Sequence, residues 1–245
     1  MMKKIPALLL VLILLTASAA ADPLPQKEDL SGSYLVPCDE NDPSAGTFIY
    51  SYTYPQVDEE AEGGAAINAF FANMADYLET FTIPLFMGED SATTITFTVT
   101  CNNDDYFSVL VKEEKVTPEK TRVRWEGYVF SRKHPDPSSK YTLPKLLGIL
   151  NAQENEEWVQ EHQNEKANET VRGLIWDMIQ DNEQEIPFYS DYTEEYLAED
   201  LNPEEDYYLD EDGEPVFYIN PGIAAPEESG LLTFPLTLEE IDDEL

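Results

Sequence analysis

The chain has 245 residues, and its 50 Asp and Glu residues outnumber its 14 Lys and Arg residues, which gives a formal net charge of −36. This charge excludes a nucleic-acid binder as the first interpretation, because phosphate backbones are held by clustered cations. A disordered acidic tail is excluded as well, since 42% of the residues are hydrophobic and 11% are aromatic, enough apolar surface for a folded core.

Residues 1–21 have the pattern of a secretory signal peptide. Lys3 and Lys4 precede the apolar run Ile5 to Leu15, and small residues then allow cleavage after Ala19 or Ala21. The alternative is an uncleaved anchor, but an apolar helix of this length reaches only about half of a ~30 Å hydrocarbon core. We therefore expect a secreted, extracellular protein without stable membrane insertion; association with a cell surface stays open as an alternative. Loss of the two lysines leaves 12 cations and 50 acids, a charge of −38.

Export changes the interpretation of the two cysteines, Cys38 and Cys101. Outside the cytosol a pair of thiols is free to oxidise, so we predict a disulfide between them. The alternative is two separate thiols. A zinc site would need His134 and His162 as additional ligands, and both lie far from the cysteines in the sequence.

The first part of the mature chain is predicted to be an extended leader, residues 22–45, followed by an N-terminal α+β unit, residues 46–131. The leader is rich in Pro, Ser and acidic residues. Residues 47–54 alternate as a strand that Pro55 ends. Apolar residues then recur at helical spacing over 62–81, although Gly63 and Gly64 weaken the start of this helix.

Three β-rich runs complete this unit: 93–101, 106–114 and 121–131. Residues 102–105, Asn-Asn-Asp-Asp, are typical of a turn. The runs therefore predict an antiparallel meander with the helix packed on one of its faces. Val123, Trp125, Gly127 and Val129 are expected to face one way on the last strand.

The second unit is predicted to span residues 132–245. A loop at 134–139, a short helix at 141–147 and a long helix at 154–180 are followed by short strands at 207–209, 215–219 and 231–236. The predicted fold class is α+β, with antiparallel sheets and packed helices.

Charge is distributed unevenly along the chain. From Gly173 to Leu245 there are 23 acids and no Lys or Arg, whereas Lys112 to Lys145 contains 9 cations and 5 acids. Complementary potential would favour encounter with a basic partner, although solubility is the simpler explanation of the acidity.

No catalytic, cofactor-binding or metal-binding residue is nominated from the sequence. Asp210 to Gly213 resembles the start of a calcium loop, but the first and twelfth positions would be Tyr208 and Ile219, which cannot supply the carboxylates required there; a turn between two strands fits better. His134 and His162 are expected at the surface. Motifs of serine hydrolases, zinc proteases and phosphate loops are absent from the sequence.

The C-terminal third resembles a known family. Its motifs are Asp-Tyr-Tyr-Leu at 206–209, Asp-Gly at 212–213, Val-Phe-Tyr-Ile at 216–219, Asn-Pro-Gly-Ile-Ala-Ala-Pro at 220–226 and Thr-Phe-Pro-Leu at 233–236. They are similar to the closing segment of the bacterial extracellular domain of unknown function that is found in the lysozyme-sensing anti-sigma factor RsiV and ahead of the catalytic domain of the peptidoglycan deacetylase PdaC. Looser matches at 54–57, in the 67–81 helix and at 141–147 extend the resemblance to about 46–241.

The chain departs from that pattern in two places. The Gly-Gly-Ala-His-Gly stretch of the family has no counterpart around 115–126, and Gly222 to Glu227 lacks both tyrosines of the usual Tyr-Glu-Ile-Ala-Pro-Tyr. If these positions contact a ligand in the family, this chain binds a different one or binds it differently.

The resemblance implies a secreted, non-catalytic binding module of the bacterial cell envelope, with no cofactor. Its expected partner is a cationic protein such as lysozyme, or peptidoglycan, the wall glycan; nucleic acid is not expected. The alternative is a cell-wall hydrolase that uses a pair of carboxylates, and a structural envelope protein without a discrete ligand is a third possibility.

Overall fold

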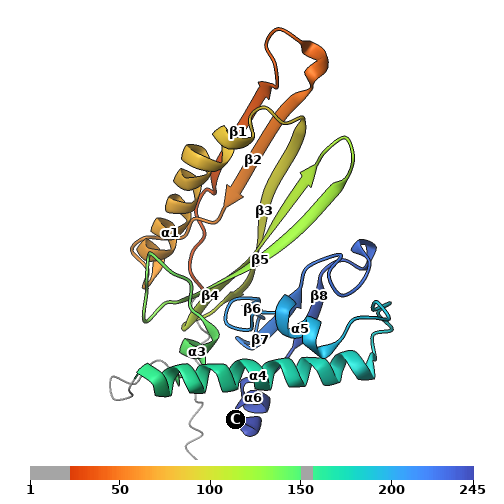
Figure 1. The fold of residues 1–245 in the computed structure, drawn as a ribbon. Coiled ribbons are helices and arrows are strands. Elements are labelled where there is room, and N and C mark those ends of the chain that lie inside the picture. The colour runs from red at the N-terminus through yellow and green to blue at the C-terminus, as the bar shows by residue number, and fades with distance from the viewer. Residues whose placement is uncertain (1–22, 150–156) are drawn as a thin grey trace, which may run out of the picture.

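The structure is a computed structural model that describes residues 23–149 and 157–245. It contains a five-stranded sheet with one long helix beside it, and a three-stranded sheet packed with further helices (Figure 1). This arrangement confirms the predicted α+β class. The predicted signal peptide, residues 1–21, lies outside the described residues.

The first sheet has the strand order β1-β2-β3-β4-β5. Neighbouring strands are antiparallel except for β2 and β3, which run parallel because the chain crosses over through helix α1 between them. The strands span Leu30–Pro37, Thr47–Tyr54, Ser91–Asn102, Tyr106–Val116 and Thr121–Ser131. The strand predicted at 47–54 and the meander are confirmed, and β1 lies within the predicted leader.

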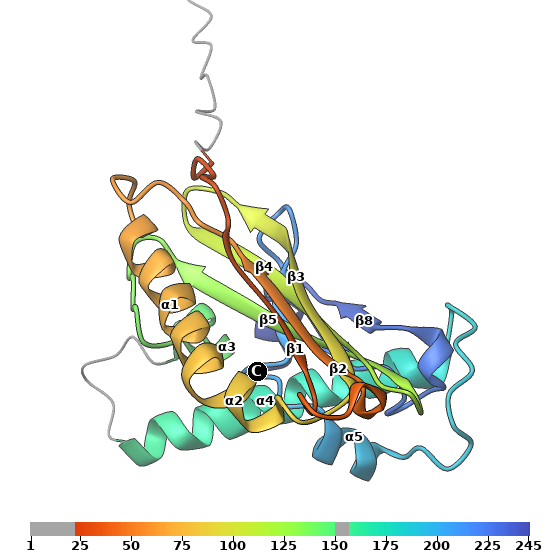
Figure 2. The same cartoon turned by 90° about the horizontal axis from the view of Figure 1, so that it is seen from above.

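Helix α1 (Gly64–Tyr77) covers one face of this sheet (Figure 2). It starts directly after Gly63 and continues through a π-helical turn, Leu78–Thr82, into the short helix α2 (Ile83–Phe86). The buried residues Ile67, Phe71 and Ala75 are four positions apart, which places them on one side of the helix. The rings of Tyr54 on β2 and of Tyr128 and Phe130 on β5 pack against Phe71 at centroid distances of 5.4–6.0 Å.

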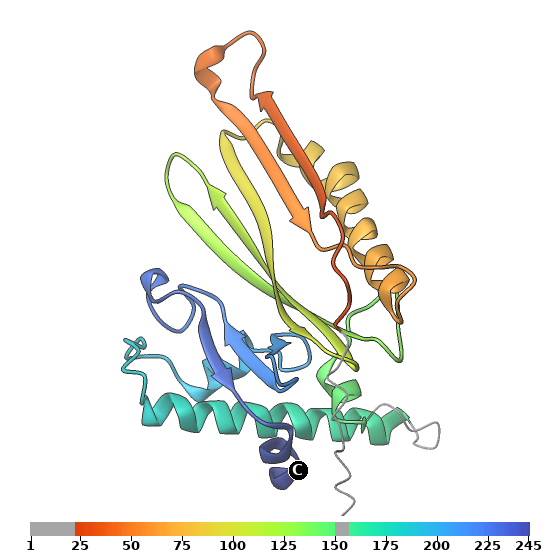
Figure 3. The ribbon, with the colours of Figure 1, turned by 180° about the vertical axis from the view of Figure 1, so that it is seen from behind.

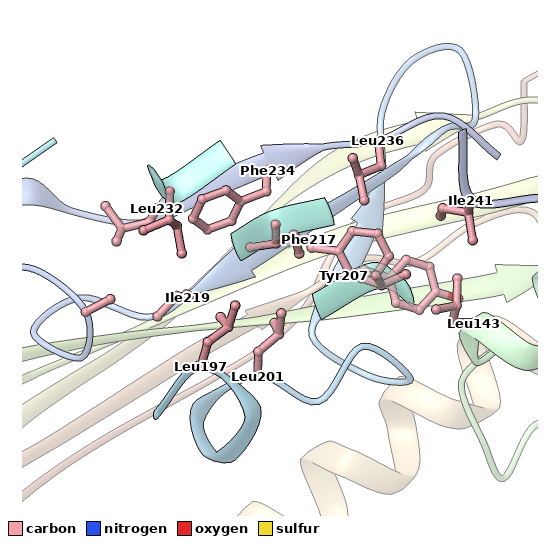
Figure 4. Close-up of a cluster of buried hydrophobic side chains, with 14 of the residues drawn as sticks. Leu143, Leu197, Leu201, Tyr207, Phe217, Ile219, Leu232, Phe234, Leu236 and Ile241 are labelled. Carbon is pink, nitrogen blue, oxygen red and sulfur yellow. The ribbon is translucent and has the colours of Figure 1, made fainter. Parts of the chain in front are cut away.

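The second unit is built on the long helix α4, Glu157–Asp181. The second sheet has the order β6-β7-β8, and its strands are Tyr207–Leu209, Pro215–Ile219 and Leu232–Pro235. The remaining helices are α3 (Leu143–Leu146), α5 (Glu194–Asp200) and α6 (Leu238–Glu244). Their apolar side chains form one buried cluster around Tyr207 and Phe217 (Figure 4).

The second unit packs on the face of the first sheet that α1 does not cover (Figure 3). At the contact, the hydroxyl of Ser108 on β4 accepts the backbone N–H of Leu209 at 2.9 Å. The unit covers only the half of this face near Val129 and Leu110, both of which are buried. The other half stays open.

The predicted disulfide is not formed in the structure, where Cys38 and Cys101 are both free thiols. Cys38 follows β1 beside Gly46 and Asp90, next to the start of β3. Cys101 lies eleven residues beyond Asp90 along the same strand, roughly 35 Å away at about 3.3 Å per residue. Disulfide geometry needs Cα atoms within about 7 Å. The two cysteines therefore sit at opposite ends of the sheet.

Candidate ligand-binding groove

The open half of the first sheet carries hydroxyl side chains. They are Ser33 on β1, Ser51 on β2, and Thr94, Thr96 and Thr98 on β3, and we call this surface the hydroxyl face. Ser51 donates a hydrogen bond to the Thr94 hydroxyl at 3.4 Å, so both side chains point to the same side. The three threonines are exposed, because strand alternation turns Ile95 between them into the core beneath α1.

The hydroxyl face continues across the sheet onto β4 and β5. Thr96 lies opposite Lys112, and Lys112 lies opposite Trp125. In antiparallel strands, residues that lie opposite one another have their side chains on the same face, so these three side chains form a row. The row ends at Trp125, whose ring centre lies 5.8 Å from the Lys112 ammonium group.

A cavity of about 880 Å³ opens at the end of this row. Val123 and Trp125 line one wall, and the loop after β7, including Glu227 and Leu231, lines the other. We call this cavity the groove. Figures 1 and 3 show the β4–β5 hairpin and this loop lying on the same side of the molecule.

The groove contains several of the 14 Lys and Arg residues of this acidic chain. Lys112 forms an ion pair with Glu114 at 2.7 Å. Arg122 and Arg124 also line the groove, and neither has a carboxylate within 4.0 Å among the residues that the structure describes. The groove therefore presents two guanidinium groups that are available to an anionic ligand, beside the carboxylates of Glu113, Glu227 and Glu228.

The outer edge of β5 is partly occupied by the second unit. The Trp125 N–H donates to the side-chain oxygen of Asn220 at 2.6 Å, and the Asn220 amide donates back to the Trp125 carbonyl at 3.1 Å. The Gly127 N–H donates to the Tyr218 hydroxyl at 2.8 Å. This edge is thus occupied by side chains from Trp125 to Gly127, and beyond them the Tyr141 N–H donates to the Val129 carbonyl at 2.6 Å.

The predicted surface histidines are where we expected them. His134 and His162 are both exposed, the first in the loop after β5 and the second on α4. His134 lines a smaller pocket of about 280 Å³ together with Asp136. Hydrogen bonds from Ser138 and Ser139 lower the pKa of Asp136 to about 2, so this carboxyl is a poor proton donor near neutral pH.

Among the carboxyl groups that the structure describes, Asp206 is the one whose pKa is raised, and the cause is its burial. Its carboxylate accepts the backbone N–H of Asn202 at 2.8 Å, within the turn that precedes β6. This contact gives Asp206 a local structural role.

The segment Asp210 to Gly213 forms the predicted turn between β6 and β7. The Gly213 N–H donates to the Asp210 carbonyl at 3.0 Å, and the Asp210 carboxylate accepts the N–H groups of Asp212 and Glu214 at 3.0 Å each. Within residues 23–149 and 157–245, no group of three or more potential metal ligands comes together. None of the helices in these two ranges is long and apolar enough to cross a membrane.

Comparison with known proteins shows that this chain resembles solved structures in its fold. No family model and no curated protein matches the chain. A crystal structure of a DUF3298 family member from Bacteroides fragilis superposes with a TM-score of 0.53 at 10% sequence identity, covering 90% of this chain and 93% of that one. A DUF3298 family protein from Pseudomonas aeruginosa gives a TM-score of 0.47 at 11% identity, covering 91% of this chain and 94% of that one.

The structural neighbours are thus proteins of a family named only as a domain of unknown function, and the likeness to the first of them shows a shared fold. It extends over almost the whole of both chains. The narrower resemblance to the RsiV and PdaC domains rests on the sequence motifs alone.

Proposed function

We propose that this protein is a secreted, non-catalytic binding module of the bacterial cell envelope, and that the hydroxyl face and the groove bind wall glycan. The observation that carries the proposal is the continuous row from the exposed Thr96 through Lys112 to Trp125, at a cavity of about 880 Å³. The motif resemblance to the RsiV and PdaC domains supports an envelope location.

The chemistry of this surface suits a sugar polymer. A hydroxyl both donates and accepts hydrogen bonds, as sugar hydroxyls do. Rows of Ser and Thr repeat every ~4.8 Å across the sheet and about every 6.6 Å along a strand, so that several sugar units find partners. The indole of Trp125 offers a flat apolar surface with a polar edge. The guanidinium groups of Arg122 and Arg124, which line the groove from the other face of β5, suit the carboxylates of wall glycan.

The hydrolase alternative finds less support. A glycosidase needs two carboxyl groups about 5–9.5 Å apart, one of them with a raised pKa. Asp206, whose pKa is raised, is engaged in a backbone turn, and Asp136 has a lowered pKa. Neither has the environment of a catalytic acid.

A cationic protein such as lysozyme is a second candidate partner. The 23 acids and absence of Lys or Arg between Gly173 and Leu245 favour it, because complementary charge speeds encounter with a basic protein. This partner would use the acidic second unit and not the cation-lined groove.

The glycan proposal is tested by calorimetric titration of the protein with soluble, lysozyme-free glycan-strand fragments. The double variant Thr94→Val, Thr96→Val removes two hydroxyls from the hydroxyl face and keeps the side-chain shape and strand propensity. We expect its Kd to rise at least tenfold, and Trp125→Ala to weaken binding similarly.

Thr82→Val, which changes a threonine near α2 on the other side of the sheet, is the matched control and should bind as the wild type does. Absence of heat with the wild-type protein would overturn the proposal, and equal binding by the double variant would remove the hydroxyl face as the site.

The lysozyme candidate is tested separately by titration at low and at physiological salt. We expect affinity to fall as salt screens the charges. Absence of heat in both conditions would eliminate lysozyme as a partner.

A further inference from the structure

We infer that the free end of the β5 edge accepts an extended segment of a partner protein as a sixth strand, and that this segment carries acidic side chains at alternate positions. The inference concerns a second ligand class and goes beyond glycan binding. It rests on backbone geometry and charge at the strand edge.

The alternation of the β ladder identifies the free backbone groups. In antiparallel pairing, every second residue directs both its N–H and its C=O away from the neighbouring strand. The contacts to Asn220 and Tyr218 identify Trp125 and Gly127 as such residues, so Val123 and Thr121 direct theirs outward as well. Within the described chain, the outward groups of these two residues meet no hydrogen-bond partner.

A side chain of the second unit already pairs with the β5 edge as the backbone of a neighbouring strand would. The Asn220 side chain both donates to and accepts from Trp125. The ladder positions before Trp125 are therefore the point at which an incoming strand could continue the pattern.

The groove provides room for such a strand. Thr121 and Val123 line its first wall, and Gly230 and Leu231 line its second wall. The cavity of about 880 Å³ between the walls lies within the range of ligand pockets, about 300–1,000 Å³. The other edge strand of this sheet, β1, contains no charged residue to choose a partner.

The side chains next to this edge specify the partner's charge. Arg122 and Arg124 are two residues apart and lie on the same face of β5, whereas Val123 and Trp125 lie on the other face. An added strand would place alternate side chains within about 4.5–5.5 Å of these neighbours. Acidic residues would therefore pair with the two unpaired guanidinium groups, and the residues between them would meet an apolar surface.

The inference is tested with the synthetic peptide acetyl-(Glu-Val)4-amide and a matched acetyl-(Lys-Val)4-amide. Titration of the whole 245-residue chain should detect binding of the first peptide only. The variant Val123→Pro removes an outward N–H that takes no part in the ladder with β4, a position where an edge strand tolerates proline. We expect it to weaken binding at least tenfold, whereas Val123→Thr, which keeps the N–H, should bind within threefold of the wild type.

A double variant Arg122→Gln, Arg124→Gln tests the charge separately, with an expected loss of at least tenfold. Circular dichroism confirms that each variant is folded. Failure of the wild type to bind the acidic peptide, or equal binding of both peptides, would overturn the inference. Unchanged binding by Val123→Pro would show that the edge is not used.

Peptide titration of the hydroxyl-face variant separates the two proposals. The double variant Thr94→Val, Thr96→Val should bind the acidic peptide as the wild type does, since its changes on β3 leave the β5 edge intact. If Val123→Pro abolished glycan binding and the acidic peptide did not bind, the edge would belong to the glycan site and the peptide inference would be wrong.

Discussion

Gly127 is a residue at which the two units approach closely. A Cβ atom at this position would lie 2.0 Å from the carbonyl oxygen of Tyr207 and 3.3 Å from the ring of Tyr218. The first contact is with backbone, which cannot rotate away. Gly127→Ala must therefore push β6 from β5, and we expect it to lower the free energy of unfolding by about 1–3 kcal/mol, the usual cost of overpacking. Urea denaturation followed by circular dichroism measures the change.

Gly173→Ala is the matched control for this substitution. Gly173 lies within α4, and a Cβ there would meet no atom within 4 Å. Because Ala is the better helix former, this change should stabilise the protein by about 0.5–1 kcal/mol. Equal destabilisation by both substitutions would contradict the close-approach argument.

The two thiols should differ in reactivity. Burial and the nearby carboxylates of Asp210 and Asp212 raise the pKa of the Cys101 thiol to about 11. The thiolate is the reactive form, so a raised pKa leaves little of it at pH 8 and the rate of alkylation should climb up to pH 11. We expect two reactive thiols per chain in unreduced, denatured protein, and in native protein Cys38, which is only partly buried, should react first. A single slow phase for both cysteines would contradict this assignment.

Among the elements, those with strong periodicity could be predicted from the sequence. The strand at 47–54 and the three strands of the meander combine alternation with β-branched and aromatic residues, and the structure has them close to the predicted bounds. Strand β1 shows no such signal, because it is an edge strand with half-buried and exposed residues in alternation and with Gly32 packed against the ring of Tyr52.

Two short helices were missed although local signals exist for them. Thr237 and Glu240 form a capping box at the start of α6, and Thr193 caps the start of α5. Each helix has only seven residues, too few for a hydrophobic period to stand out in so acidic a segment.

The candidate site was not predictable from the sequence. The alternation of Thr94, Thr96 and Thr98 along a strand shows that they share one face, but it does not tell which face stays open. That depends on where the second unit packs, and contacts such as the one from Trp125 to Asn220 join residues 95 positions apart.

Asn220, which directly follows β7, holds this strand against β5. Asn220→Ala removes both hydrogen bonds to the Trp125 backbone and leaves a partly buried N–H and C=O without these partners. We expect a loss of about 1–3 kcal/mol in unfolding free energy, measured by urea denaturation. Asn41→Ala, at an exposed position outside the strands, is the control and should change stability by less than about 0.5 kcal/mol. Equal effects would remove the special role of the Asn220 amide.

At the scale of the whole molecule, the fold gathers several of the few cations of this acidic chain at one place. The chain carries a net charge of −36, yet the β4–β5 hairpin brings Lys112, Lys115, Lys120, Arg122 and Arg124 together at one end of the first sheet. The second unit, which contains the cation-free segment from Gly173 onwards, packs beside the base of that hairpin. A ligand would therefore meet a groove in which Lys112, Lys115, Arg122 and Arg124 lie beside the carboxylates of Glu113, Glu227 and Glu228. Salt should weaken the binding of anionic ligands to the two arginines while it stabilises the fold.

The effect of salt on the fold itself is the broadest prediction. A net charge so far from zero destabilises the compact state through self-repulsion, and the Debye length shortens from about 30 Å at 0.01 M salt to about 8 Å at 0.15 M. The melting temperature at pH 7 should therefore rise with NaCl over this range, by about 2–4 °C for each kcal/mol gained. At pH 4.5, closer to the ordinary pKa values of Asp and Glu, partial protonation lowers the net charge and the rise should be smaller. Calorimetric scans at both pH values measure it; a melting temperature that falls with salt at pH 7 would mean that attractive ion pairs outweigh the repulsion among the 50 acids.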